Sequence, residues 1–310
     1  MWGTIVSRDG KMRLLIVGSG GVGGYLGARL LQAGADVHFL ARGEHAEAMR
    51  RRGLEIVEEG SSRLYPVTVT EDASGLGLFD LLIISVKSVD LQSALDAISE
   101  NVGEKSLILP VMNGVEQLQK IQERYAQARV LPACIYIVSN ILRAGVIEKR
   151  GKVFKLCWGD AERESSEYAD ISRLFDRAGF RHEYSRDIAR AQWRKYIFIS
   201  SMATLTSFYG ETMREIYDRH GEELEAAMRE VASVASAKGI EIGEEEIEKS
   251  MKQASQVSEG AKTSMQLDIE RGKKPELESL TGYVCTEASR LGLETPVLSS
   301  LYQGLLERLS

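Results

Sequence analysis

The feature that most constrains the fold is a glycine-rich loop directly after a short apolar segment near the N-terminus. Residues 12–17 read MRLLIV and are apolar except for Arg13, as expected for a strand that is covered on both faces. The next six residues, 18–23, read GSGGVG and fit the pattern G-x-G-x-x-G. Residues 25–32 then have the pattern of a helix. A strand, a glycine loop and a helix in this order predict the start of a βαβ unit.

This loop predicts a dinucleotide-binding site. Gly18 would allow the tight turn, Gly20 would let the backbone approach a pyrophosphate, and Gly23 would let the helix pack closely on the strand. The amides and the dipole of a helix N-terminus attract phosphates. The alternative is a glycine-rich turn without a ligand, but the strand–loop–helix context favours the dinucleotide. We assign the whole loop to the cofactor: Gly18, Ser19, Gly20, Gly21, Val22 and Gly23.

The second predicted strand, residues 37–40, indicates which dinucleotide is bound. An NAD site usually has an Asp or Glu near the end of this strand, where it holds the ribose 2′-hydroxyl. Here the strand leads instead to Arg42, whose planar guanidinium suits a 2′-phosphate. The sequence therefore predicts NADP(H) over NAD(H). The alternative is that Arg42 is an ordinary surface arginine and Glu44 serves the ribose.

Strand and helix patterns alternate through the first half of the chain, which predicts a mostly parallel sheet. Residues 44–52 have the pattern of a charged helix, and residues 81–86 and 107–111 are apolar enough for buried strands. Residues 130–139 and 153–158 are expected to extend the same sheet.

The pattern changes after about Asp187 and becomes almost entirely helical, with acidic stretches at residues 222–230 and 241–248 that we interpret as solvated helix faces. A chain of 310 residues is consistent with two domains. We predict an α/β fold in which residues 1–186 form an NADP-binding, Rossmann-type doubly wound sheet. Residues 187–310 would form an all-helical domain for substrate binding and dimerisation.

Composition excludes several classes of protein. The 39 basic and 45 acidic residues give a net charge of −6, which argues against a nucleic-acid partner. The three cysteines are far apart, which supports neither a disulfide framework nor a metal site. No apolar run approaches the ~20 residues of a membrane span, and residues 1–11 do not resemble a secretory signal. We therefore expect a cytoplasmic protein.

Two polar residues follow the predicted strands of the sheet. Lys87 follows residues 81–86 and Asn113 follows residues 107–111, so both should lie at the carboxyl edge, where open α/β sheets bind their ligands. Taken alone, Lys87 is equally consistent with a solubilising strand end. Asn113 and the glycine after it are, taken alone, better explained as an ordinary turn.

The helical half contains three further candidates. Lys195 heads an apolar stretch, residues 196–202, and a partly desolvated ammonium there could donate a proton to a developing alkoxide. Pattern alone favours a lysine that extends along an amphipathic helix to reach water. Ser264 could bind a carboxylate and Glu276 a hydroxyl, although both also look like surface residues beside a loop.

Taken together and in this order, these residues resemble the ketopantoate reductase (2-dehydropantoate 2-reductase) family. The resemblance extends over residues 12–306 and includes a Ser-Met pair followed by Asp268, and a Pro-Glu pair before a Gly-Tyr-Val segment. It implies an NADPH-dependent reduction of a 2-oxo acid, ketopantoate, to a 2-hydroxy acid on the route to pantothenate and coenzyme A. It also implies a Rossmann domain and a helical domain with the site in the cleft between them.

The resemblance also assigns roles to the residues. The glycines of the loop, Arg42 and Lys87 match cofactor positions, and Asn113 matches a residue between nicotinamide and substrate. Lys195 matches the catalytic lysine that protonates or polarises the ketone oxygen. Ser264 and Glu276 match substrate-binding positions, and the glutamate is expected to hold both a substrate hydroxyl and the lysine.

The chain departs from the family pattern at three positions. Ile199 and Ala203 stand where many members have asparagines, and Thr281 replaces a further asparagine. Each hydrogen-bond partner that is lost should weaken the binding of a polar substrate by roughly 1–3 kcal/mol. The alternatives to ketopantoate reduction are therefore reduction of a more apolar 2-oxo acid, or a non-enzymatic NADP-sensing role. A homodimer is possible.

Overall fold

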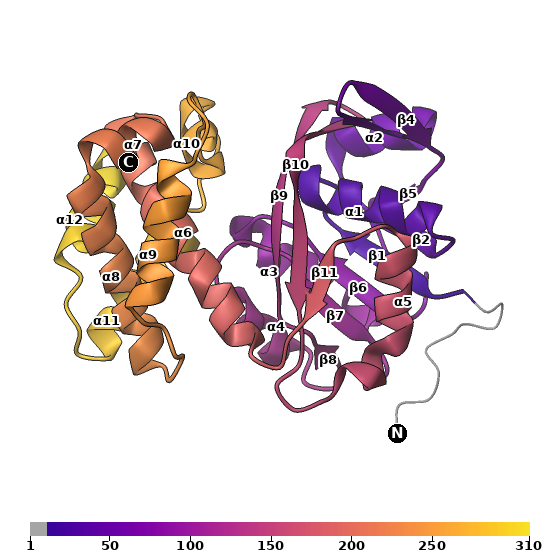
Figure 1. Ribbon diagram of the computed structural model, residues 1–310. Coiled ribbons are helices and arrows are strands. Elements are labelled where there is room, and N and C mark those ends of the chain that lie inside the picture. Colours follow the sequence, from indigo (N-terminus) through magenta and orange to yellow (C-terminus); the bar gives the residue numbers. More distant parts are fainter. Residues whose placement is uncertain (1–10) are drawn as a thin grey trace. The chain divides into compact units, whose positions relative to one another are not determined.

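The computed structural model describes residues 11–310, and contacts within the chain divide it into two units. The first unit comprises Met1–Met112, described from Lys11 onward, and Gln117–Ile188. The second comprises Asn113–Glu116 and Ala189–Ser310. Figure 1 labels most of the helices and strands of both units. Residues 1–10, which contain most of the segment tested for a secretory signal, lie outside the described residues.

A six-stranded parallel sheet forms the centre of the first unit. Its strand order is β5-β2-β1-β6-β7-β8. In chain order the strands are β1 (Arg13–Val17), β2 (Asp36–Leu40), β5 (Thr68–Thr70), β6 (Leu81–Ile84), β7 (Leu107–Pro110) and β8 (Arg129–Val130). The helices of this unit are α1 (Gly21–Gln32), α2 (Gly43–Arg52), α3 (Leu91–Ala97), α4 (Gln117–Arg124) and α5 (Ala169–Arg177), with short 3₁₀ turns η1 (Ser88–Asp90), η2 (Ser99–Asn101) and η3 (Ser165–Tyr168).

Both faces of this sheet are buried, as the apolar strand sequences predicted. Successive residues of a strand point to opposite faces. Leu14 belongs to an apolar cluster with residues of α1 and α5, whereas Leu15 belongs to a second cluster with residues of α3 and α4. Helices therefore cover both faces, and the predicted Rossmann-type doubly wound sheet is confirmed.

A second, five-stranded sheet contains the strands that we expected to extend the first one. It has the order β11-β10-β3-β4, with β9 paired to β10. The strands are β3 (Leu54–Glu58), β4 (Ser61–Tyr65), β9 (Ala133–Arg143), β10 (Val146–Trp158) and β11 (His182–Tyr184). The prediction for residues 130–139 and 153–158 is therefore wrong, except for Val130, which lies in β8. A strand's own pattern reports how deeply it is buried but does not specify which sheet it joins.

Helix α1 is packed between the two sheets (Figure 1). Its glycines permit this close packing. A Cβ atom at Gly27 would lie 2.4 Å from the ring of Phe39 in the parallel sheet, and one at Gly24 would lie 2.1 Å from Ile147 in the second sheet. The run of glycines thus supports two helix–sheet contacts in addition to the predicted phosphate loop.

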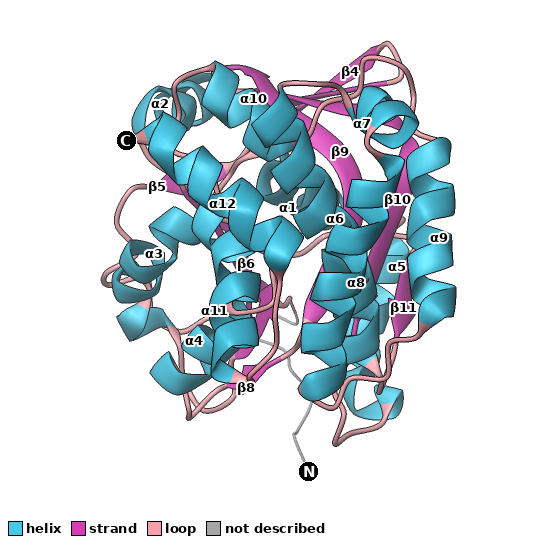
Figure 2. Cartoon of the chain, turned by 90° about the vertical axis from the view of Figure 1, so that its left-hand side faces the viewer, coloured by secondary structure: helices cyan, strands magenta, loops and turns pink. Residues whose placement is uncertain are grey.

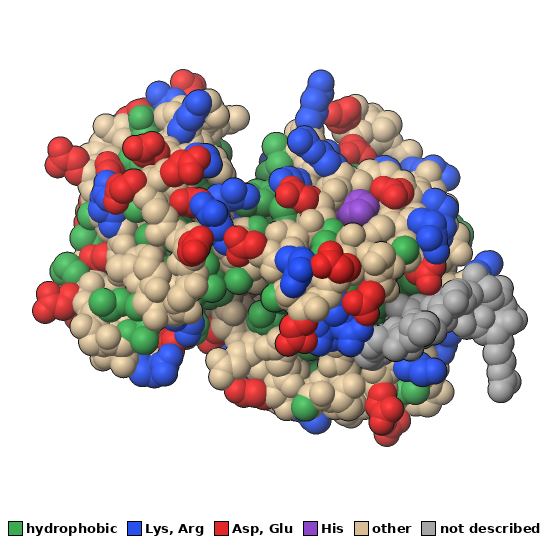
Figure 3. Space-filling model, turned by 60° about the horizontal axis from the view of Figure 1, so that its bottom comes forward, with side chains coloured by type: hydrophobic (Ala, Val, Ile, Leu, Met, Phe, Trp, Pro, Cys, Tyr) green, Lys and Arg blue, Asp and Glu red, His purple; other side chains and the backbone are tan. Residues whose placement is uncertain are grey.

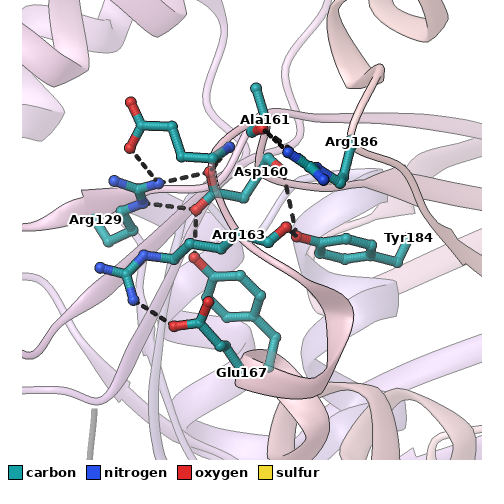
Figure 4. Close-up of polar contacts among 9 residues, drawn as sticks. Arg129, Asp160, Ala161, Arg163, Glu167, Tyr184 and Arg186 are labelled. Atoms are coloured by element: carbon teal, nitrogen blue, oxygen red, sulfur yellow. Dashed lines mark hydrogen bonds and ion pairs between the residues drawn. The ribbon is translucent and has the colours of Figure 1, made fainter. Parts of the chain in front are cut away.

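A buried ion pair joins the ends of the two sheets (Figure 4). Asp160, just after β10, accepts hydrogen bonds from Arg129 of β8, with Nε at 2.7 Å and Nη2 at 2.5 Å. The Tyr168 hydroxyl also donates to this carboxylate, and the Glu162 amide donates at 2.9 Å. Burial alone would raise the pKa of Asp160, but the hydrogen bonds from Arg129 and Tyr168 hold it below its usual value.

The second unit is helical, which confirms the predicted class of the C-terminal half (Figure 2). Its helices are α6 (Ile188–Tyr209, which begins one residue before the unit), α7 (Met213–Arg219), α8 (Gly221–Ala237), α9 (Glu244–Ser255), α10 (Ser264–Glu270), the π-helix η4 (Glu278–Gly282), α11 (Tyr283–Arg290) and α12 (Pro296–Leu309). Helix α8 packs against α9, α11 and α12. The buried Glu230 of α8 accepts the amides of Val297 and Leu298, both at 2.8 Å, and so caps the start of α12.

Charges of both signs are interspersed over the part of the first unit that Figure 3 shows. Many form ion pairs, such as Lys155 with Glu183 at 2.6 Å and Arg163 with Glu167 at 2.5 Å. Among the described helices, none combines the length and apolar character needed to cross a membrane.

The ion pair of Figure 4 leads to a stability prediction. Asp160→Ala should lower the free energy of unfolding by about 2–4 kcal/mol, because it removes the buried partner of Arg129. Glu162→Ala is the matched control, since Glu162 contacts the same guanidinium at 2.9 Å but its side chain is 77% exposed, against 5% for Asp160. The control should lose less than about 1 kcal/mol. Urea unfolding of the two variants measures both values, and equal losses would contradict the assignment.

Candidate active site

Four parallel strands end at the same level of the sheet. Val17 of β1 lies beside Leu40 of β2 and Ile84 of β6, and Ile84 lies beside Pro110 of β7. The segments that follow these strands therefore emerge at one edge. The chain passes from β1 to β2 on one side and returns to β6 on the other, so this edge contains the topological switch point, where such sheets bind ligands.

The glycine loop lies at this edge and has the geometry of a phosphate cradle. Gly18 has φ +92°, a conformation that side chains disfavour. Gly20 precedes the first residue of α1, and a Cβ atom there would meet no protein atom within 4 Å. The space beside Gly20 is thus open, next to the N-terminus of a twelve-residue helix. Ser19 is buried, while Gly21 and Val22 are partly buried in the first turn.

Ser85, which directly follows β6 and was missed in the sequence, supports the loop. Its hydroxyl donates to the Gly18 carbonyl at 2.6 Å. A Cβ atom at Gly23 would lie 2.0 Å from this hydroxyl and 2.1 Å from the Gly18 carbonyl. The role predicted for Gly23, close packing of helix and strand, therefore has a definite partner. Ser85 was overlooked because it lies within the apolar segment 81–86, where it looked like part of the strand.

His45 of α2 was also missed, although it lies three residues after Arg42. Its Nδ1 accepts the backbone N–H of Gly145, at the turn between β9 and β10, at 3.0 Å. Burial lowers the pKa of His45, and the nearby Ser19 backbone partly offsets this effect. The ring is therefore neutral at pH 7, and it joins the glycine-loop region to the second sheet. A lone histidine in a charged helix carries no signal for such a role.

The predicted 2′-phosphate residue lies at the same edge. Arg42 is exposed, two residues beyond the end of β2 and immediately before α2. Glu44, the alternative ribose ligand, is exposed in the first turn of that helix. Lys87 is partly buried and precedes η1, after β6. Arg42 and Lys87, the two predicted cofactor-binding residues outside the loop, therefore follow strands that end at the same edge of the sheet as the loop.

Lys195 and Asn113 are brought together in the second unit. The Lys195 ammonium donates to the Asn113 side-chain carbonyl, with Nζ and Oδ1 2.8 Å apart. Asn113 follows β7 in sequence, but residues 113–116 group with the helical unit. Lys195 does not open a helix as predicted. It lies in the third turn of the 22-residue α6, because the helix begins at Ile188. The apolar pattern had marked only residues 196–202, since polar residues occur among those before Lys195.

The other predicted residues of this unit differ in burial. Glu276 is only 7% exposed, two residues before η4. Ser264 is exposed as the first residue of α10, which is capped by the Thr263 hydroxyl. Asp268 of the same helix is buried. The alternative interpretation of Glu276 as a surface residue is wrong, because the segment directly before η4 is buried in the unit.

The three positions that depart from the family pattern lie in or beside the helical core. Ile199 is partly buried and packs against the apolar core of this unit, and Ala203 belongs to that core. Thr281 is fully buried, and its hydroxyl lies 2.6 Å from that of Thr204. Spacings of four residues place Lys195, Ile199 and Ala203 on one side of α6. The side of the helix that carries the lysine is therefore apolar along its next two turns.

Comparison with known proteins identifies relatives of the whole chain. Residues 14–162 match the family model "Ketopantoate reductase PanE/ApbA", and residues 187–308 match the model of its C-terminal part. An uncharacterized oxidoreductase of Bacillus subtilis, YkpB, is 29% identical, with 95% of this chain and 98% of that protein covered. A 2-dehydropantoate 2-reductase of Mesorhizobium japonicum is 28% identical, with 96% and 98% covered. The crystal structure of a PanE/ApbA-family ketopantoate reductase from Ralstonia eutropha superimposes with a TM-score of 0.88 at 25% identity, covering 96% and 98% of the two chains.

Gly20 and Gly23 of the loop should respond differently to substitution. Gly23→Ala should lower the free energy of unfolding by about 1–3 kcal/mol, because its methyl group would overlap the Ser85 hydroxyl and the Gly18 carbonyl. Gly20→Ala should change it by less than about 0.5 kcal/mol, since the space there is open and the backbone conformation suits alanine. Denaturant unfolding of both variants tests the pair. A large loss for Gly20→Ala would show that the space beside this residue is filled by protein.

Proposed function

This chain belongs to the ketopantoate reductase family, and on that basis we propose that it reduces 2-dehydropantoate (ketopantoate) to pantoate with NADPH, in the biosynthesis of pantothenate and coenzyme A. It is an oxidoreductase that acts on a 2-oxo acid. The observation that carries the proposal is the hydrogen bond between Lys195 and Asn113, which places an ammonium beside an amide in the helical unit.

The residues at the edge of the parallel sheet fit an NADP(H) cofactor. The open space beside Gly20 and the N-terminus of α1 suit a pyrophosphate. The exposed Arg42 suits a 2′-phosphate, and Lys87 adds a second positive charge at the same edge. When bound, NADPH would supply the hydride that reduces the ketone carbon.

Lys195 would supply the proton. As hydride reaches the carbonyl carbon, negative charge develops on the ketone oxygen, and an ammonium beside that oxygen stabilises the charge and protonates it. Asn113 holds the ammonium in place through its side-chain oxygen. We assign Glu276 to the substrate hydroxyl and Ser264 to the substrate carboxylate. Glu276 is buried, so little water competes with the substrate hydroxyl for its carboxylate.

The second candidate function is the reduction of a more apolar 2-oxo acid. Ile199 and Ala203 favour it, because the side of α6 that carries Lys195 offers no hydrogen-bonding side chain at these positions. Steady-state rates with a panel of 2-oxo acids separate the candidates. Ketopantoate should have the highest kcat/KM if the first candidate is right.

If the unmodified protein reduces no 2-oxo acid at any pH, the result favours the NADP-sensing alternative instead. Homodimerisation through the helical unit stays a prediction.

Substitution of the lysine tests the proposed chemistry. Lys195→Ala should lower kcat by roughly 10²–10⁴-fold, the usual contribution of a positioned acid, while NADPH affinity stays nearly unchanged. NADPH consumption with ketopantoate measures the first quantity and cofactor fluorescence titration the second. Lys249→Ala is the matched control, since Lys249 makes an exposed ion pair with Glu245 on α9. Full activity of Lys195→Ala would rule the residue out as the acid.

Substitution of the arginine tests the cofactor preference. Arg42→Ala should weaken NADPH about 10–100-fold, because it removes charge-assisted hydrogen bonds to the 2′-phosphate, and should leave NADH almost unchanged. Arg50→Ala, which removes an exposed arginine of α2 that pairs with Glu71, serves as the control. Titration with both cofactors gives the ratio. Equal weakening of the two would count against a 2′-phosphate role and favour Glu44 as a ribose ligand.

A further inference from the structure

The helical unit contains a π-helix, η4 (Glu278–Gly282), directly before α11. The Tyr283 amide bonds the Glu278 carbonyl, five residues earlier. π-Helices are rare and are frequently found at functional sites. Because the extra residue widens the turn, carbonyls of a π-helix can also accept hydrogen bonds from neighbouring side chains.

Helix α6 carries a row of hydroxyl groups that form hydrogen bonds with η4. The Tyr196 hydroxyl donates to the carbonyls of Ser279 at 2.7 Å and Leu280 at 3.0 Å. The Ser200 hydroxyl donates to the Leu280 carbonyl at 2.6 Å. One turn further, the hydroxyls of Thr204 and Thr281 are 2.6 Å apart. The spacing 196, 200, 204 places the three α6 hydroxyls on one side of the helix.

These hydrogen bonds are shielded from water. Tyr196, Ser200 and Thr204 are each no more than 1% exposed. Burial raises the pKa of Tyr196 well above its usual value, so its hydroxyl remains a donor at working pH. A buried carbonyl that loses its donor is costly, which gives this contact a strongly preferred geometry.

The same contact connects Lys195, the proposed acid, with Glu276, the proposed substrate-binding carboxylate. Tyr196 directly follows Lys195 in α6. Its partner Ser279 donates through its own hydroxyl to the Glu276 carbonyl at 3.2 Å, and the Leu280 amide bonds the same carbonyl at 3.0 Å. A single residue, Ser279, therefore links the backbone of Glu276 to the residue beside Lys195.

We propose that Tyr196, assisted by Ser200 and Thr204, is a positioning residue that holds the backbone of Glu276 in register with Lys195. It acts through Ser279 and touches neither substrate nor cofactor. This inference rests on the proposed function, because it takes Lys195 and Glu276 as the acid and the substrate-binding carboxylate. The π-helix is then the device that presents its carbonyls to α6.

The test compares two tyrosines that bond the same π-helix from different sides. Tyr196→Phe removes the buried hydroxyl, whereas Tyr302→Phe removes a hydroxyl of α12 that bonds the exposed Glu278 carboxylate, with both oxygens at 2.8 Å. We expect Tyr196→Phe to lower kcat about tenfold with NADPH affinity unchanged, because small displacements of reacting groups have large effects on rate. Tyr302→Phe should stay near the wild-type kcat.

A second readout does not depend on turnover. Competitive acylation of the Lys195 amine, followed by mass spectrometry over a range of pH, reports the environment of the ammonium. The pH midpoint should shift in Tyr196→Phe and remain at the wild-type value in Tyr302→Phe. If the unmodified protein reduces no 2-oxo acid, the proposed function fails, and the acylation profiles still decide this inference.

The outcome that overturns the inference is a Tyr196→Phe protein that is less stable but keeps the wild-type kcat and acylation profile. The role of the hydroxyl would then be purely structural. If Tyr196→Phe does not fold, Ser200→Ala decides by the same two readouts, since it removes one donor to Leu280 and leaves the donor from Tyr196 in place. Wild-type values for Ser200→Ala would then overturn the proposal.

Discussion

The N-terminal unit depends on a helix that lies close to two sheets at once. Helix α1 can do so because glycine occupies the positions where its backbone approaches Phe39 on one side and Ile147 on the other. The same helix begins at the open space beside Gly20, where its N-terminus faces the edge of the parallel sheet. Tight packing and the proposed phosphate binding thus depend on one glycine-rich segment. Ser85, directly after β6, and His45 of α2 hold this region, and both contacts leave the space beside Gly20 open.

The helical unit differs from the first unit, because it places polar groups within an apolar core. Its apolar cluster surrounds α6, yet that helix carries the Lys195 ammonium on one side and three buried hydroxyls on another. Two of these hydroxyls, those of Tyr196 and Ser200, donate to carbonyls of η4, and the Thr204 hydroxyl pairs with the hydroxyl of Thr281. Hydrogen bonds in such surroundings are geometrically restrictive, since the alternative is an unsatisfied buried group.

The sequence predicted the parts whose signals are local. The apolar strand 12–17 corresponds to β1, and the glycine loop leads into α1 as predicted. The change to a helical pattern near residue 187 corresponds to the start of α6. Prediction failed where partners come from distant segments. Residues 133–158 have clear strand patterns but join β3 and β11 in a separate sheet. Lys195 seemed to head a helix because polar residues interrupt the apolar pattern before it, whereas α6 extends seven residues further toward the N-terminus.

The sequence by itself determined the residue chemistry: a glycine loop after a buried strand, an arginine after the second strand, and a lysine on an apolar helix. These features depend on neighbours within a few residues, so they can be recognised without coordinates. Only the tertiary structure decided which groups meet. It paired Lys195 with Asn113, 82 positions apart, buried Glu276, and brought Tyr196 to the carbonyl of Ser279. The physical reason is that hydrogen bonds between distant segments are specified by how whole helices and sheets pack, and no local pattern encodes that packing.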